Sequence, residues 1–379
     1  MQRVPGEVLG QRQASARQQM AALGVDSLLV TSLPNVFYLT GHEGSAGVVL
    51  LTASRALLYV DPRYVEAVTQ LQASPAAPPD LEVRIVPASY DQAIVDGLID
   101  LGLTRVGVEA GHLTLGRHRW FVATLAQTAP TVELVATEGL LEDARAVKDA
   151  HEVALLRRSC LGLTAVADAG FRAVGAGVAE REVAGAIEQA LRAGGYARPA
   201  FDTIVGSGPN GALPHYRAGE RRLERGDLVV LDFGGVLDGY CSDLTRTVVV
   251  GEANAKAREV YAAVLAAQQA GIEAVRPGIP ASAVDAAARQ ELARRGFGEA
   301  FTHGTGHGLG IDVHELPRVS RARADSSAPE GLLKPGMVVT IEPGAYLPGW
   351  GGVRIEDDVL VTETGYEVLT SVTRELLTL

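Results

Sequence analysis

Acidic residues occur at matching places in two similar segments of the chain. GDLVVLD ends at Asp232 and GMVVTIE ends at Glu342, and each leads through a glycine-containing turn into a second segment with a further acid, Asp243 or Glu356. If both units are β-hairpins, residues that face each other across a ladder have numbers with a constant sum, so we expect each hairpin to place its two acids directly opposite one another. The repetition predicts an internal duplication that brings four carboxylates together.

The chemistry of such a site follows from the apolar runs LVVL and VVTI, which precede Asp232 and Glu342 and should be buried. Buried carboxylates repel one another and lose hydration, and bound cations are the simplest compensation. Surface acids in turns are the alternative, but they would not explain these apolar runs. A donor set rich in carboxylates suits Mn²⁺, with Co²⁺ and Zn²⁺ as possibilities. Two ions about 3.5–4 Å apart could share bridging carboxylates.

Histidines cluster in FTHGTGHGLGIDVHE, which contains His303, His307 and His314. The Gly-Thr-Gly spacer between the first two predicts a loop and not the helical H-E-x-x-H pattern of a zinc protease. The glycines also resemble a dinucleotide fingerprint faintly, but no apolar strand precedes them and nearby acids would repel a pyrophosphate. We therefore interpret the segment as an active-site loop.

Two further segments could supply donors. NGALPHY places His215 on a loop before the first hairpin. Arg354 precedes Glu356 by two residues and should share its face of the strand, because side chains alternate between the two faces. Its simplest role is that of a charge partner for the acids.

The elements that position these residues suggest two domains, since 379 residues exceed one typical domain. We predict an α/β domain over residues 1–143 and an α+β domain over 144–379. In the first, strands are expected over residues 26–32, 46–52, 56–60, 105–109 and 131–135, with helices over 88–101 and 114–128. In the second, helices are expected from about residue 150 to 174 and over 180–193, 253–274 and 281–295.

Composition limits the possible functions. The net charge of −11, with 45 acidic and 34 basic residues, argues against nucleic-acid and anionic-membrane binding. Only two cysteines are present, which indicates a reducing compartment rather than a disulfide scaffold. No apolar run is long enough to span a bilayer. The first 20 residues lack a secretory apolar region and predict an ordinary helix, so we expect a cytoplasmic protein.

Taken together, these residues resemble the pita-bread metallopeptidases, in particular the proline-peptidase branch that contains aminopeptidase P and prolidase. The resemblance rests on LDFGGVLDGYCSDLTRT, HGTGHGLGIDVHELP, TIEPGAY and GGVRIEDDVLVT, and more loosely on PNVFYLTGHEGSAGVVLLT and VDPRYVEA. It implies a creatinase/prolidase-type N-terminal α/β domain followed by an α+β pita-bread catalytic domain with pseudo-two-fold duplication. The metal ligands that it implies are Asp232, Asp243, His307, Glu342 and Glu356.

The branch within this family is chosen on additional features, because methionine aminopeptidases share five such ligands. These features are His303, four residues before His307, the Thr-Arg-Thr that follows Asp243, the position of Arg354, and the N-terminal domain. The resemblance implies two divalent ions per chain, with Mn²⁺ preferred, and hydrolysis of the bond between an N-terminal residue and a following trans-proline by a metal-activated water.

The resemblance also implies roles for individual residues. Glu342 would act as a proton shuttle as well as a ligand, and His314 would donate to the developing oxyanion. His215 and His303 would shape the proline side of the pocket and contact substrate carbonyls. Arg354 would hold the hydrogen-bond network behind the metals.

Several alternatives remain open at this stage. We favour an aminopeptidase that acts on longer peptides over an Xaa-Pro dipeptidase, which would need a cation such as Arg63 or Arg318 for the substrate carboxylate. A non-catalytic peptide-binding module on the same fold and an NAD-dependent oxidoreductase are more remote. The family resemblance also implies a homodimer, with peptide as the partner.

Overall fold

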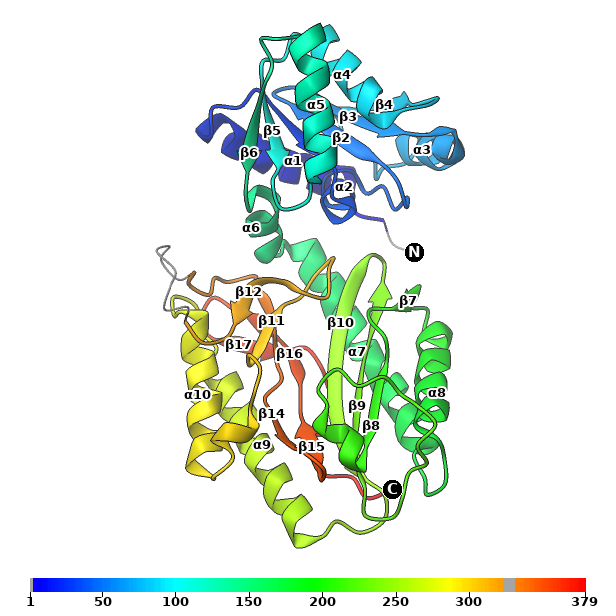
Figure 1. Ribbon diagram of the computed structural model, residues 1–379, viewed down its shortest axis with the longest axis vertical. Helices are drawn as coiled ribbons and strands as arrows, with labels where there is room; N and C mark the ends of the chain where they lie inside the picture. Colours follow the sequence, from blue (N-terminus) through cyan, green and yellow to red (C-terminus); the bar gives the residue numbers. More distant parts are fainter. Residues whose placement is uncertain (1–2, 323–330) are drawn as a thin grey trace. The chain divides into compact units, whose positions relative to one another are not determined.

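The computed structural model describes residues 3–322 and 331–379. The chain divides into two compact units, Met1–Arg145 and Ala146–Leu379. In the described part of the chain, no helix combines the length and apolar character that crossing a bilayer requires. The two units are drawn in Figure 1.

The first unit is built on a six-stranded mixed sheet in the order β4-β3-β2-β1-β5-β6. Its strands are β1 (Ser27–Val30), β2 (Val48–Thr52), β3 (Ala56–Val60), β4 (Leu81–Ile85), β5 (Arg105–Glu109) and β6 (Glu133–Thr137). Its helices are α1 (Gly6–Ala22), α2 (Leu33–Thr40), α3 (Val65–Gln72), α4 (Tyr90–Asp100), α5 (Leu115–Thr128) and α6 (Leu140–Ala146), with a short 3₁₀ helix at Pro62–Tyr64. Strands β1 to β3 are fully buried, which agrees with their continuous apolar runs.

The last strand of this unit is shifted along the sequence from its expected position. The strand expected over residues 131–135 begins at Glu133 and ends at Thr137. Its position is set by parallel pairing with β5, in which Arg105 faces Glu133 and forms an ion pair with it. The local apolar pattern predicted a start two residues too early. The start is set by pairing with a strand 28 residues away in the sequence.

The second unit contains a helix pair followed by strands twice. The first half has α7 (Ala150–Ala173), α8 (Glu180–Ala193), β7 (Arg198–Pro199), β8 (Ile204–Ser207), a 3₁₀ helix at Gly208–Ala212, β9 (Leu228–Leu237) and β10 (Tyr240–Val249). The second half has α9 (Ala255–Ala274), α10 (Ala281–Arg294), a 3₁₀ helix at Gly298–Ala300, β11 (Gly306–Gly308), β12 (Glu315–Val319), β13 (Val338–Ile341), β14 (Gly344–Leu347), β15 (Gly351–Arg354), β16 (Asp357–Val361) and β17 (Tyr366–Val368). Each half is thus a helix pair followed by strands that end in a long hairpin, as the internal duplication predicts (Figure 1).

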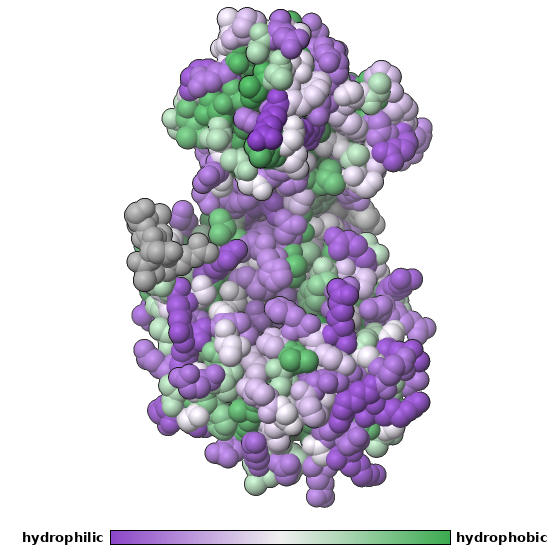
Figure 2. Space-filling view, viewed as in Figure 1, coloured by the Kyte–Doolittle hydropathy of each residue, from purple (hydrophilic) through white to green (hydrophobic). Residues whose placement is uncertain are grey.

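The helix pair of the first half shows why these segments are helical and where they pack. Asp149 and Glu152 form a capping box at the start of α7, which satisfies two amide groups of the first turn. Helix α8 buries Val183, Ile187 and Leu191 at helical spacing. Its outer face is polar, and hydrophilic side chains gather on this side of the unit in Figure 2. The buried stripe holds the helix against the strands that carry the first pair of acids.

The register of the first hairpin differs from the expected one. Asp232 on β9 pairs with Thr245, and Asp243 on β10 pairs with Gly234, so the two acids are diagonal neighbours and do not face each other directly. The reason is a two-residue turn at Asp238-Gly239, where both residues have positive φ, 50° and 86°. The shift of two residues keeps both acids on one face of the ladder, because side chains alternate with a period of two.

The second hairpin has the expected register, interrupted at the acids. Ile341 pairs with Asp357 and Gly344 pairs with Arg354, so Glu342 and Glu356 occupy matching places at the break between the two ladders. The amides of the two acids bond elsewhere. The Glu356 amide donates to the carbonyl of Thr245 on β10 over 3.1 Å, and the Glu342 amide donates to the carbonyl of Thr305 over 2.8 Å. The break therefore joins the second hairpin to the first hairpin and to the histidine-rich loop.

Candidate metal centre and active site

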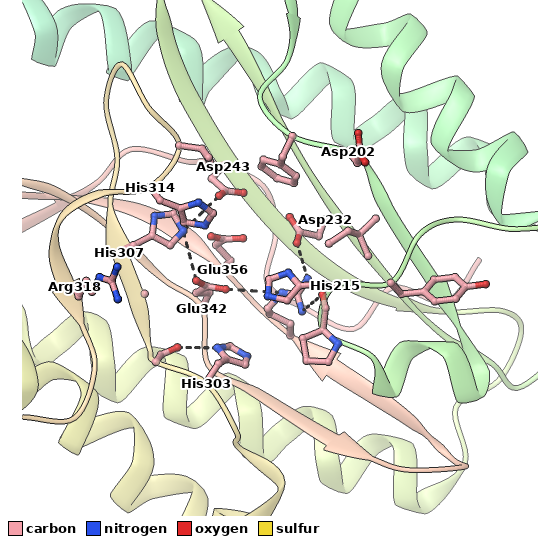
Figure 3. Close-up of a pocket in the computed structure, with 18 of the residues that line it drawn as sticks. Asp202, His215, Asp232, Asp243, His303, His307, His314, Arg318, Glu342 and Glu356 are labelled. Carbon is pink, nitrogen blue, oxygen red and sulfur yellow. Dashed lines mark hydrogen bonds and ion pairs between the residues drawn. The ribbon is translucent and has the colours of Figure 1, made fainter. Parts of the chain in front are cut away.

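A cavity of about 680 Å³ lies in the second unit where the two hairpins meet (Figure 3). All of the expected site residues line it, namely His215, Asp232, Asp243, His303, His307, His314, Glu342, Arg354 and Glu356. The wall also contains Phe201, Asp202, Ile204, Pro214, Tyr216, Arg217, Gly304, Gly306, Val313 and Arg318. Side chains from both halves of the duplicated unit thus converge on one cavity.

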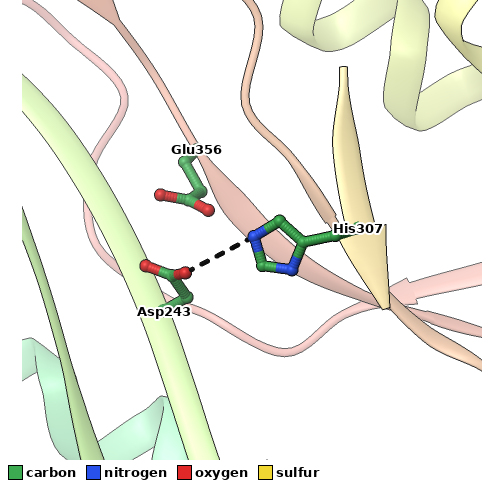
Figure 4. Close-up of side chains that lie close together, drawn as sticks. All are labelled: Asp243, His307 and Glu356. Atoms are coloured by element: carbon green, nitrogen blue, oxygen red, sulfur yellow. Dashed lines mark ion pairs between the residues drawn. The ribbon is translucent and has the colours of Figure 1, made fainter. Parts of the chain in front are cut away.

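Three side chains in this cavity form a group that could hold a cation. Ligand atoms of Asp243, His307 and Glu356 all lie within 4.8 Å of one another, and the three residues come from β10, β11 and the break before β16 (Figure 4). His307 Nε2 is 3.8 Å from Asp243 Oδ2 and 3.6 Å from Glu342 Oε1. His307 was expected in a loop, but it lies in the three-residue strand β11, whose pairing with β12 and β13 fixes its backbone.

The acids of the cavity carry oxygens that the described residues leave without a hydrogen-bond partner. These buried oxygens are Asp232 Oδ1, Asp243 Oδ1 and Glu356 Oε1. Burial, followed by the charge of Asp232, raises the pKa of Asp243 well above its usual range. Burial raises the pKa of Glu342 to about 8. Oxygens that are buried, unpaired and mutually repelling are the donor set that a divalent cation neutralises, so the residues present fit a metal centre.

The imidazole of His307 is prepared to act as a metal ligand. Its Nδ1 contacts the carbonyl of Gly308 at 3.0 Å, so the other nitrogen, Nε2, faces the acids. Burial lowers the pKa of His307 to about 4, and the ring is therefore neutral near pH 7. A neutral imidazole with its second nitrogen held by a backbone carbonyl is the usual form of a histidine ligand.

Arg354 is a charge partner of the cavity acids, as expected. It is buried and donates to Asp232 Oδ2 over 2.5 Å, to the Tyr346 hydroxyl over 2.8 Å and to Thr245 Oγ1 over 3.2 Å. Its Nε lies 4.0 Å from Glu342 Oε2. One guanidinium thus connects two acids with two neutral side chains, which fixes the orientation of the Asp232 carboxylate.

The other three histidines occupy different environments. His303 is held on both sides, with Nε2 at 2.8 Å from the Tyr346 hydroxyl and Nδ1 at 2.7 Å from the Gly304 carbonyl. Burial lowers the pKa of His303 to about 4, so this ring is also neutral. His314 and His215 are more exposed, and the ring of His314 lies 4.3 Å from that of His307. These two rings are free to face a molecule in the cavity.

No role was assigned from the sequence to two residues that orient this site. Thr245 donates from Oγ1 to Glu356 Oε2 over 2.6 Å, and Tyr346 connects Arg354 to His303. Thr245 could have been found from strand alternation, because it lies two residues after Asp243 on the same face. Nothing in the spacing of the sequence indicates the contacts of Tyr346, since β14 brings it to the histidine loop only in the folded chain.

The two arginines considered as partners for a substrate carboxylate, Arg63 and Arg318, lie in different surroundings. Arg318 lines the cavity, on the same side of it as His307 in Figure 3, and no ion pair within the described residues involves it. Arg63 belongs to the first unit, where it pairs with Asp61 at 2.8 Å and is 71% exposed. Of these two arginines, only Arg318 is among the residues that line the cavity.

Comparison with known proteins gives two family matches that together cover most of the chain. Residues 154–363 match metallopeptidase family M24, and residues 12–147 match the creatinase/prolidase N-terminal domain. An α/β N-terminal domain of creatinase/prolidase type followed by a pita-bread catalytic domain is therefore confirmed as the fold. Membership of this family implies a divalent metal, and Asp243, His307 and Glu356 could hold one.

Individual relatives extend over nearly the whole chain. An Xaa-Pro dipeptidase of Pyrococcus horikoshii is 37% identical over 361 residues, which covers 93% of this chain and 95% of that protein. The structure of an Xaa-Pro dipeptidase from Bacillus anthracis has a TM-score of 0.90 at 35% identity, covering 98% of this chain and 100% of that one. The X-Pro aminopeptidase of Thermotoga maritima has a TM-score of 0.86 at 30% identity, covering 97% of this chain and 99% of that one.

Proposed function

The chain belongs to metallopeptidase family M24, and we propose that it hydrolyses the peptide bond between an N-terminal residue and a following trans-proline. The observation that carries this proposal is the convergence of Asp232, Asp243, His307, Glu342 and Glu356 on one cavity. The names of the relatives support the choice of an Xaa-Pro bond. A non-catalytic binding module would have no need for several buried acids with unpaired oxygens.

We propose that two divalent cations occupy the centre, with Mn²⁺ preferred and Co²⁺ or Zn²⁺ as alternatives. Asp232, Asp243, His307, Glu342 and Glu356 would hold these ions. Bound cations would supply an activated water at neutral pH and would polarise the substrate carbonyl. Metal analysis of the purified protein after reconstitution should give two ions per chain, and a ratio of one would overturn the two-ion proposal.

The remaining steps are assigned to side chains of the cavity. Glu342 accepts the proton of the attacking water and passes it to the proline nitrogen as that nitrogen leaves. His314 donates to the oxyanion that develops on the carbonyl. His215 contacts substrate carbonyls on the proline side. His303, whose two nitrogens bond Tyr346 and Gly304, shapes that side of the pocket, and Arg354 keeps Asp232 in place.

Selectivity for proline has a physical basis. The Xaa-Pro bond has no amide hydrogen, so a site that relies on this donor cannot bind it. The ring is rigid and loses little conformational entropy on binding, and the trans tertiary amide presents a fixed shape. A cavity that recognises the ring and the free amino group therefore acts on a bond that other exopeptidases leave intact.

The length of the substrate is the finer question, and two observations now favour dipeptides over the longer peptides that the sequence alone favoured. Two relatives at 35% and 37% identity carry the name Xaa-Pro dipeptidase. Arg318 lines the cavity without an ion-pair partner among the described residues, and it could bind the carboxylate at the end of an Xaa-Pro dipeptide. Aminopeptidase activity is the second candidate, because the X-Pro aminopeptidase structure is similar over nearly the full chain.

Kinetics with matched substrates test both candidates. With Mn²⁺ present, the enzyme should cleave an Xaa-Pro dipeptide faster than an Xaa-Pro-Xaa tripeptide or the same dipeptide with an amidated carboxyl group. Arg318→Ala should raise KM at least about tenfold for the free dipeptide and leave the amidated form nearly unchanged. Faster cleavage of the tripeptide, with no effect of the substitution, would assign an aminopeptidase, and no cleavage of either would reject the function.

We also propose that the chain forms a homodimer, as the family resemblance implies. Light scattering on the purified protein should give twice the chain mass of 39.7 kDa. A single-chain mass at micromolar concentration would contradict this.

A further inference from the structure

Glu180 is a buried acid that the proposed chemistry does not use. It is the first residue of α8, it is 0% exposed, and it does not line the cavity. Four donors converge on its carboxylate: the Ser207 amide at 2.8 Å, the Ser207 hydroxyl at 2.6 Å, Asn210 Nδ2 at 3.0 Å and the Gly219 amide at 3.3 Å. A buried carboxylate with this many partners is an anchor for the backbone around it.

The segment that Glu180 anchors, residues 207–219, carries part of the cavity wall. Glu180 binds both ends of the segment, at Ser207 and Gly219. Between these ends lie Pro214, His215, Tyr216 and Arg217, all of which line the cavity. Most of the segment has no strand to hold it, since β8 ends at Ser207 and a short 3₁₀ helix ends at Ala212. The carboxylate thus replaces the backbone ladder that a loop of this length lacks.

Two contacts carry the effect of the anchor to the cavity. Asn210 donates to Glu180 and also to the Tyr216 hydroxyl, over 2.9 Å, so one amide group links the buried acid to a wall residue. The carbonyl of Pro214, next to His215, accepts a bond from Arg354 Nη1 over 3.4 Å. The position of His215 therefore depends on Glu180 at one side and on Arg354 at the other.

The second half of the duplicated unit uses the same device. Asp285 on α10 is 1% exposed and accepts bonds from the amide and the hydroxyl of Thr305, at 3.0 and 2.9 Å. Thr305 lies between His303 and strand β11, which carries His307. In both halves, a buried acid on the second helix accepts the amide and hydroxyl of one Ser or Thr that adjoins residues of the cavity wall. This repetition indicates a shared positioning role and not a local accident of packing.

We propose that Glu180 is a positioning residue that sets substrate affinity by holding the 207–219 segment, with His215 and Tyr216, against the cavity. It contacts no member of the proposed metal centre, so the metal ions and the chemical step do not depend on it. The substrate in this inference is taken from the proposed function, whereas the anchoring of the segment by Glu180 does not depend on that function. Without the anchor, the 207–219 segment is mobile. Substrate binding is then weakened by the entropy cost of ordering this segment.

The test compares two substitutions in the first turn of one helix. Glu180→Gln keeps the size of the side chain but presents an NH₂ group where the carboxylate accepts bonds. Glu182→Gln is the matched control, because Glu182 is exposed and bonds only the amide of Ala179 at the helix start. With Mn²⁺ and an Xaa-Pro dipeptide, Glu180→Gln should raise KM at least about tenfold with kcat within about threefold of wild type. Metal affinity and Glu182→Gln should match the wild type.

A readout that needs no substrate separates this inference from the proposed function. Arg217 is 87% exposed in the anchored segment, so trypsin cleavage after it reports local opening of the segment. We expect cleavage after Arg217, identified by mass spectrometry, to be at least about tenfold faster in Glu180→Gln. If the wild type cleaves no Xaa-Pro peptide, the proposed function fails while this measurement still decides the anchor.

Two kinds of result would contradict a positioning role for Glu180. Wild-type KM together with wild-type cleavage after Arg217 would overturn the proposal. A general loss, in which metal affinity falls and trypsin cuts throughout the chain, would show a structural role instead. If Glu180→Gln does not fold, Asn210→Ala removes one donor of the anchor from a half-buried position, and it should raise KM about threefold in the same pattern.

Discussion

Arg354 donates from Nη2 to Oδ2 of Asp232 across 2.5 Å, and the other oxygen of this carboxylate, Oδ1, is buried without a partner among the described residues. The same guanidinium bonds Thr245 and Tyr346. One buried cation therefore orients an acid of the first hairpin from a strand of the second.

Arg354→Lys should weaken metal binding although it conserves the charge. A lysine ammonium cannot reproduce the planar fork that reaches Asp232, Thr245 and Tyr346 together. We expect metal affinity and activity to fall about 10–100-fold, measured by titration with Mn²⁺ and by peptide hydrolysis. Arg294→Lys is the control, since Arg294 pairs with Glu291 on the surface and is 65% exposed. Equal behaviour of the two variants would contradict a role for the fork.

Thr245→Val should reduce metal affinity more than it reduces stability. The substitution keeps the shape of the side chain but removes the hydroxyl that donates to Glu356 Oε2 over 2.6 Å. Thr247→Val is a close control, because Thr247 lies two residues along the same strand and bonds only the backbone of Arg354. Both variants should lose about 1–3 kcal/mol of stability in urea unfolding. Only Thr245→Val should bind Mn²⁺ about tenfold more weakly, and a similar loss in both would refute the distinction.

The stability of the metal-free protein should fall as pH rises from about 6.5 to 8. Burial raises the pKa of Glu342 from 4.5 to about 8 and that of Asp358 from 3.8 to about 7. A carboxyl whose pKa is raised on folding stabilises the protein fully below its unfolded pKa, and this contribution is lost as pH rises through the folded pKa. His303 and His307, with pKa values lowered to about 4, act in the opposite sense only below pH 6.5.

Thermal unfolding of the metal-free protein from pH 6.5 to 8.5 checks this prediction. The melting temperature of the wild type should decline across the range, and Glu342→Gln should flatten the decline because it removes one titrating group. Saturating Mn²⁺ should raise the melting temperature most at the upper end, where the acids would otherwise be charged and unpaired. A melting temperature that rises with pH in the absence of metal would show that these pKa values are not raised.

Asp357 should be far more important for stability than for metal binding. It is fully buried, and its oxygens accept bonds from Arg246, Gln268, Thr370 and Arg374 at 2.5 to 2.8 Å. Asp357→Asn leaves the buried Arg246 without its charge partner, and we expect a loss of about 3–5 kcal/mol in urea unfolding. Glu367→Gln, which breaks an exposed pair with Arg157, should cost less than about 1 kcal/mol. Similar losses in the two variants would contradict this assignment.

Local patterns in the sequence determined the elements of this protein and the identity of the acids. The helix expected over residues 180–193 is α8 with the same bounds, and its buried residues Val183, Ile187 and Leu191 follow the helical period. The apolar runs before Asp232 and Glu342 predicted buried acids, and the repeated pattern predicted that two hairpins would share them. These inferences needed only neighbours along the chain.

Only the tertiary structure decided how those elements meet. The two-residue turn at Asp238-Gly239 shifted the first hairpin by two residues, so Asp232 and Asp243 are diagonal neighbours. The bond from the Glu356 amide to Thr245 joins residues 111 positions apart, as does the side-chain bond between them. No local period encodes such pairings, because they depend on which surfaces pack once the helices and strands exist. For the same reason, the anchoring of a cavity loop by Glu180 became visible only in the folded chain.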